Sequence, residues 1–317
     1  MRNTGRENRN YAKRRNYWLL RILRAAGILM AATGIIFFCL FLADRYFRTH
    51  ITLRGIQNAW KSRDYQTVYD DGRQFLQKHP FNNSALTYSG YAGFFLAVSQ
   101  NDTYQAQNYL DSSINSMRAA LYGASEQLRP QLEYMLGKAY FYKNTISSYY
   151  YADLAVKYLE LSRQHGYSAE DTAEYLGLSY AALGMTMESI SAFTEALLVR
   201  ESDSLLLSIA EQYYRAGEFS AAKQYLYRIN SSTSNDEIML KSRYLLGTIC
   251  CDEGDYDGAM SEFNEVLRKD KNSADAHYGI GVIYEKQGNI VRARSEWRQA
   301  LRIQANHPGA LKKISDN

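Results

Sequence analysis

The chain has 317 residues, of which 46% are hydrophobic and 22% charged, with 3 prolines and 28 tyrosines. This composition is that of a folded protein whose helices can run without interruption. The formal net charge is +4, but the first 24 residues hold eight basic residues against one acid, a net +7, which leaves the remainder at −3. Because a nucleic-acid-binding domain carries its basic excess on the folded part, we expect no nucleic-acid partner.

An uncharged run of 19 residues follows, from Ala25 to Ala43. It is long enough to cross a bilayer core of about 30 Å, and basic residues are denser before it than after it. The positive-inside rule then places the N-terminus in the cytoplasm. We therefore predict a basic cytoplasmic arm (1–24) and a transmembrane signal-anchor (25–43). The protein would cross the inner (cytoplasmic) membrane once, with its C-terminal domain periplasmic.

Three alternatives compete with the signal-anchor. A cleaved signal peptide needs small residues before its cleavage site, whereas Phe41 stands near the end of this run. A lipoprotein needs a small residue before its cysteine, but Phe38 precedes Cys39. A buried core helix would not be so uniformly apolar next to a charged arm.

Beyond this run the sequence repeats itself every 34 residues. Five pairs of residues show the period: Gly247 and Gly281, Gly254 and Gly288, Ala259 and Ala293, Phe263 and Trp297, Leu267 and Leu301. The two units, 240–273 and 274–307, abut without a gap. A fixed period of this kind is typical of solenoids, in which each unit buries its apolar face only against its neighbours.

The pattern resembles the tetratricopeptide-repeat (TPR) family, whose 34-residue units carry small residues where their two helices meet and a glycine at the turn between them. Further units fit upstream, starting near Pro130, Glu170 and Asp203, the first with about six extra residues at 145–151. The resemblance covers 49–307. It implies an all-α fold, a right-handed superhelix (α-solenoid) of about seven helix-turn-helix units, closed by a capping segment at 308–317.

The sequence shows no catalytic motif. It has no phosphate-binding glycine loop and no zinc-protease motif, its five histidines are scattered, and Cys250 and Cys251 are adjacent. The acids Glu133, Glu160, Glu174 and Glu188 are expected to lie on solvated helix faces. We therefore expect no enzyme, no cofactor, no metal site and no small-molecule substrate.

The resemblance also implies where partners bind. TPR proteins meet their ligands through positions 2, 5, 9, 12 and 13 of the first helix of each unit, on the concave face. Those positions carry the following candidates here: Tyr134, Lys138, Phe141, Tyr142, Leu207, Glu211, Tyr214, Arg215, Tyr244 and Tyr278. Tyrosines with a few charges are typical of protein interfaces, although each of these tyrosines could instead pack between neighbouring units.

These features predict a membrane-anchored scaffold that assembles or spaces other proteins of an envelope complex. The layout is similar to that of bacterial inner-membrane assembly factors, among them the periplasmic collar proteins of spirochaete flagellar motors. Two alternatives stay open, an adaptor or quality-control factor in envelope biogenesis and an accessory subunit of a membrane enzyme.

Overall fold

The computed structural model describes Met30, residues 33–41 and residues 51–316 of the chain. Residues 51–316 are helical, with no strand among them. In chain order the helices form seven pairs and a last single helix: α2 (Leu53–Lys61) and α3 (Tyr65–Lys78), α4 (Asn83–Val98) and α5 (Thr103–Tyr122), α6 (Arg129–Ile146) and α7 (Ala152–Gln164), α8 (Thr172–Ala182) and α9 (Thr186–Val199), α10 (Asp203–Arg215) and α11 (Phe219–Ser232), α12 (Asp236–Glu253) and α13 (Tyr256–Lys269), α14 (Ala274–Lys286) and α15 (Ile290–Ile303), and α16 (Pro308–Ser315).

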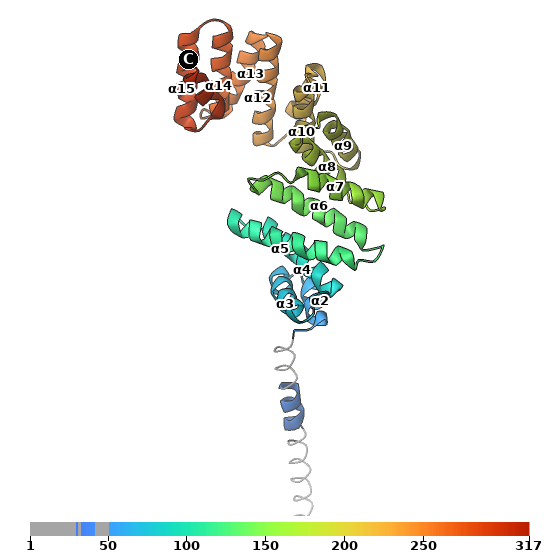
Figure 1. Ribbon diagram of the computed structural model, residues 1–317. Coiled ribbons are helices and arrows are strands. Elements are labelled where there is room, and N and C mark those ends of the chain that lie inside the picture. Colours follow the sequence, from blue (N-terminus) through green and yellow to red (C-terminus); the bar gives the residue numbers. More distant parts are fainter. Residues whose placement is uncertain (1–29, 31–32, 42–50, 317) are drawn as a thin grey trace, which may run out of the picture. The chain divides into compact units, whose positions relative to one another are not determined.

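The chain divides into two compact units, Met1–Ala92 and Gly93–Asn317, and the division falls within α4. In the second unit each helix from α6 onward packs against the helices before and after it. First helices also contact first helices of neighbouring pairs, as α10 does with α12 and α12 with α14 (Figure 1). This stacking of helix hairpins is a TPR-like solenoid, as the sequence predicts.

Local sequence signals account for the helix ends. Asn235 begins α12 by accepting hydrogen bonds from the backbone amides of Glu237 and Ile238 at 3.0 and 3.2 Å, and Asp255 begins α13 in the same way. Between these two helices Gly254 has φ 85°, a left-handed conformation that glycine adopts without a steric penalty. The predicted glycine turn is therefore confirmed.

Glycines also let the helices of a pair approach closely. A Cβ on Gly247 would lie 2.7 Å from the Phe263 ring, and one on Gly281 would lie 2.4 Å from Trp297 Nε1. A Cβ on Gly279, in the next pair, would lie 2.5 Å from the same Phe263 ring. Phe263 therefore fills the space between two repeats, and Trp297 is fully buried within the last one.

The pair α6 and α7 contains the insertion that the sequence predicts. Its residues 147–151 form the connection between the two helices. The amide of Tyr151 donates to Asn144 Oδ1 at 2.8 Å, and the Tyr151 ring stacks on that of Tyr140 at 6.2 Å. The side chains of Tyr149 and Tyr150 are exposed.

The first unit has an aromatic centre. The Trp60 ring lies 5.6 Å from those of Tyr65 and Tyr88 and 6.0 Å from that of Tyr91. At the turn between α2 and α3, Arg63 takes a positive φ of 59°. A glycine stands at this turn in the C-terminal repeats.

Part of the predicted membrane segment at 25–43, namely residues 25–29, 31, 32, 42 and 43, lies outside the described residues. Residues 33–41, which are described, are helical and exposed. Among the helices of the described residues, none is both long and apolar enough to cross a membrane.

Candidate functional site

The predicted concave-face residues fall into two groups in the second unit. The first group lies on α6 and faces α8. The second group lies on α10, α12 and α14.

The α6 group is occupied by contacts with the next repeat. The hydroxyl of Tyr134 donates to Asp171, the residue before α8, and Lys138 Nζ lies 2.8 Å from the other carboxylate oxygen of Asp171. Lys138 also lies 4.6 Å from the centroid of the Tyr175 ring, whose hydroxyl is 3.1 Å from that of Tyr142. Tyr134 is only 8% exposed. These side chains therefore join α6 to α8.

Phe141 completes this group. Its ring meets the Tyr175 ring edge-on at 5.1 Å.

Burial, followed by the hydrogen bond to Asp171, raises the pKa of Tyr134 well above its usual value. Burial and the neighbouring Tyr142 hydroxyl do the same for Tyr175. Both phenols therefore remain protonated at neutral pH.

The second group surrounds an open pocket. Tyr214, Tyr244 and Tyr278 come from three successive first helices, and they line a depression of about 290 Å³. The rest of its wall comes from Thr248, Cys251, Asp252, Phe263, Gly279 and Val282. We call this site the tyrosine pocket.

Each tyrosine of the tyrosine pocket is fixed by a different contact. Tyr214 donates its hydroxyl to Asp252 at 2.8 Å, and the Tyr244 ring packs on Phe263 at 5.6 Å. The Tyr278 ring lies 5.0 Å from that of His307, just before α16. Most of the pocket wall is thus held in place by the repeat packing.

Burial raises the pKa of three groups of the tyrosine pocket, Tyr214, Tyr244 and Cys251. Burial, and then the bond to Asp252, raises the pKa of Tyr214 to about 12. Burial also raises the pKa of Tyr244, with the charge of Asp275 contributing in the same direction. Burial raises the pKa of the Cys251 thiol. At neutral pH the hydroxyls of Tyr214 and Tyr244 and the thiol of Cys251 therefore keep their protons, beside an apolar floor.

The remaining candidates lie beside the tyrosine pocket. Leu207 is buried in the core between α10, α11 and α12. Glu211 and Arg215 are exposed. Although Glu211 is exposed as a residue, its surroundings remove water from the carboxyl group and raise its pKa, against the opposing charges of Arg215 and Lys241.

Sequence reasoning missed several wall residues although a signal for them existed. Thr248, Cys251 and Asp252 stand at positions 9, 12 and 13 of the unit that starts at Leu240, and Val282 stands at position 9 of the next unit. These are positions at which the family binds ligands. The candidates predicted from those two units, Tyr244 and Tyr278, both stand at position 5.

The expected solvation of the helix-face acids is wrong for Glu133. It is 3% exposed, and its Oε2 lies 2.7 Å from His165 Nδ1. The prediction failed because the partner, His165, follows α7 and is 32 residues away from Glu133 in the sequence. Within the residues that the structure describes, no group of three or more His, Cys, Asp or Glu side chains is arranged to hold a metal ion.

Fold and site together define a helical-repeat protein of the TPR type, a class that generally scaffolds protein interactions. Two family models match its C-terminal part, one described as TPR repeat over residues 247–288 and one as tetratricopeptide repeat over 274–307. This part of the chain therefore carries TPR repeats. No curated protein sequence matches the chain.

Solved structures of TPR proteins resemble a large part of the chain. The C-terminal part of a TPR repeat-containing protein from Cytophaga hutchinsonii is 12% identical with a TM-score of 0.57, covering 83% of this chain and 99% of that one. A tetratricopeptide repeat protein from Parabacteroides merdae is 16% identical with a TM-score of 0.53, covering 83% and 96%. YrrB, described as a TPR protein with an unusual peptide-binding site, is 23% identical with a TM-score of 0.46, covering 64% and 99%. At these identities the first two likenesses show the fold alone.

Proposed function

We propose that this chain is a non-enzymatic scaffold that holds a segment of a partner protein in the tyrosine pocket. One observation carries the proposal: three consecutive first helices each place one tyrosine around a single open depression. Aromatic side chains in desolvated pockets supply most of the binding energy at protein interfaces. The pocket walls are already fixed by packing, so a ligand need not order them.

The lining defines what the tyrosine pocket accepts. Phe263 and Gly279 give it an apolar floor, which suits an aliphatic or aromatic side chain. The Asp252 carboxylate favours an amide or a cationic group next to that side chain. The best ligand is therefore a peptide segment with one apolar anchor and a hydrogen-bond donor beside it.

The test fills the tyrosine pocket without removing a tyrosine. Val282→Trp places a bulky side chain at a half-buried wall position, and Met187→Trp, on the exposed surface of α9, is its matched control. Partners of the intact chain are crosslinked in its own membranes and quantified after capture. We expect Val282→Trp to lose the partner that the wild type and Met187→Trp both retain. Equal recovery with all three proteins, at equal melting temperatures, would refute the proposal.

We further propose that residues 25–43 anchor the scaffold in the inner membrane, with the solenoid in the periplasm. The uncharged run and the basic arm before it support this. A reporter that is active only outside the cytoplasm, fused after Asn317, should be active. It should fall silent when the basic residues at 13–24 are neutralised and lysines are added after Asp44. Activity of a cytoplasm-only reporter at the same place would contradict the orientation.

An anchored periplasmic solenoid suits an envelope assembly, such as a flagellar motor. In that case the solubilised protein should elute in gel filtration as part of a stable large complex. A transient, client-dependent shift would instead favour an adaptor in envelope biogenesis. A one-to-one complex would favour an accessory subunit of a membrane enzyme.

A further inference from the structure

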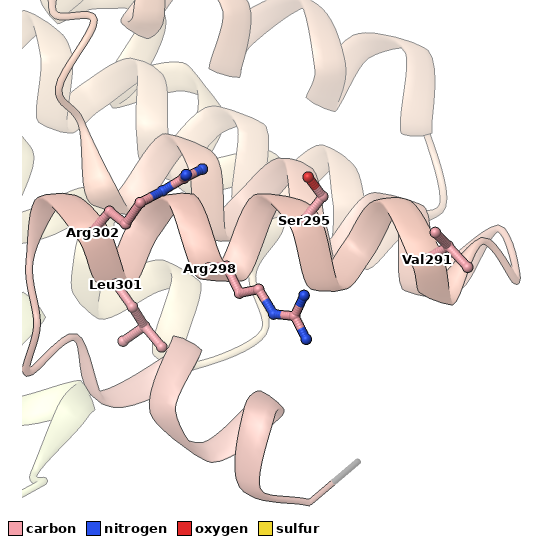
Figure 2. Close-up of a pocket in the computed structure, with 5 residues that line it drawn as sticks. All are labelled: Val291, Ser295, Arg298, Leu301 and Arg302. Atoms are coloured by element: carbon pink, nitrogen blue, oxygen red, sulfur yellow. The ribbon is translucent and has the colours of Figure 1, made fainter.

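The second helix of the last repeat has a surface unlike the corresponding surface of the preceding repeat. A depression of about 660 Å³ lies on α15 and is lined by Val291, Ser295, Arg298, Leu301 and Arg302. Figure 2 shows that all five side chains come from this one helix. They lie 4, 7, 10 and 11 residues after the first, so they share one face of the helix. We call this surface the arginine face.

The preceding repeat shows what this face ordinarily carries. The positions 34 residues earlier on α13 hold Asp257, Ser261, Asn264, Leu267 and Arg268. Val291 therefore stands where α13 has an aspartate, and Arg298 stands where α13 has an asparagine. In addition Glu265, which pairs with Arg268 at 2.9 Å, corresponds to Gln299, three residues before Arg302.

The result is a pair of arginines without acidic partners. At or near the ends of α7, α9, α11 and α13, an arginine pairs with a glutamate: Arg163 with Glu195, Arg200 with Glu174, Arg228 with Glu201, and Arg268 with Glu265. Within the described part of the chain, no carboxylate pairs with Arg298 or Arg302. Val291, the second residue of α15, is 84% exposed.

We propose that the arginine face docks an acidic helical segment of a partner protein. Arg298 and Arg302 are one helical turn apart, so they match two carboxylates spaced by one turn on a helix lying alongside α15. Val291 and Leu301 would contact apolar side chains at the two ends of that segment. This surface belongs to a second helix, whereas the tyrosine pocket lies among first helices, so the two sites are independent.

A lipid surface fits these observations less well. Membrane binding by charge calls for a broad basic surface, whereas the arginines of the neighbouring second helices are neutralised by glutamates. A short depression with two guanidinium groups favours individual carboxylates of a polypeptide.

The test converts the arginine face into the surface that α13 already has. Val291→Asp, Arg298→Asn and Gln299→Glu together reproduce residues that the preceding repeat accommodates at the same positions. The control protein carries Ser191→Asp, Ser220→Asp and Gln224→Glu, which change the net charge equally at exposed positions of α9 and α11. All proteins are full-length chains purified in detergent.

The probe is a fluorescent synthetic helical peptide with glutamates four residues apart and leucines at both ends, and its comparison peptide has glutamines in place of the glutamates. We expect the wild type and the control to bind the acidic peptide, and the converted protein to bind it about tenfold or more weakly. Binding should weaken as salt rises. Equal binding by all three proteins, or equal binding of the glutamine peptide, would overturn the proposal. If the converted protein lost only its binding to phosphatidylglycerol vesicles, the arginine face would bind a membrane. If it lost only its self-association, the face would bind a second copy of the chain. Either result would also overturn the proposal.

Discussion

The hydroxyl of Tyr134 is the most direct test of whether the α6 candidates stabilise the solenoid or are free to bind a partner. Tyr134→Phe removes only the hydroxyl that donates to Asp171. A hydrogen bond to a charged group contributes about 1.5–3 kcal/mol. Because Lys138 still pairs with Asp171 at 2.8 Å, we expect a loss of about 1.5 kcal/mol in the free energy of unfolding, at the low end of that range.

Lys138→Met tests the same contact from the other partner. The Lys138 side chain is 15% exposed, so water screens its charge only weakly, and losing it leaves Asp171 with one partner. Since both changes act on Asp171, their effects should not add in the double variant.

Urea unfolding and hydrogen exchange of α6 and α8 measure these effects. Tyr150→Phe is the control, because that side chain is 87% exposed and the same hydroxyl is lost without a structural effect. If Tyr134→Phe and Lys138→Met both unfold within about 0.5 kcal/mol of the wild type, the contact does not stabilise the fold. The α6 residues would then be available to a partner, as the sequence predicts.

Three further changes test other parts of the structure. Gly281→Leu would force a side chain into Trp297 and should lower the free energy of unfolding by about 1–3 kcal/mol. Hydrogen-exchange protection should be lost in α12–α16 and kept at residues 85–120. Equal loss of protection in both regions would contradict repeat-by-repeat stability. Arg63→Gly should stabilise the first unit by about 0.5–1 kcal/mol in thermal unfolding, because a non-glycine residue at φ 59° costs roughly 1–2 kcal/mol and the freer unfolded glycine offsets part of the gain. The pKa of Glu211 is raised in the folded protein, so its contribution to stability is present at low pH and is lost as pH rises through that pKa. Glu211→Gln should therefore raise the melting temperature at pH 7 but not below about pH 4. An equal shift of the melting temperature at both pH values would refute this.

Much of the fold was predictable because the C-terminal repeats obey a strict period. Glycines at 247 and 281 mark close helix contacts, and Gly254 marks a left-handed turn. Helix ends were less predictable: α12 begins at Asp236, before the unit start at Leu240, because Asn235 provides a cap there. Nothing in the sequence indicates that Arg63 adopts a positive φ, since a polar residue at a turn is compatible with several conformations.

The site was predictable only as a set of positions. Family positions gave Tyr214, Tyr244 and Tyr278, which the structure brings together around one pocket. They could not show that Tyr134 is paired, because Asp171 comes from the next repeat, 37 residues away. Which groove residues face open space depends on side chains of two repeats at once.

One repeat position explains why the groove is filled at one place and open at another. Tyr175 stands at position 6 of the unit that starts at Glu170, and its ring occupies the space between α6 and α8, 5.1 Å from Phe141. The same position of the unit that starts at Ala274 is Gly279. With no side chain there, the Phe263 ring packs directly against Gly279, and both residues line the tyrosine pocket. The glycine at this position, one residue after Tyr278, therefore leaves the tyrosine pocket open, whereas Tyr175 fills the equivalent space between α6 and α8.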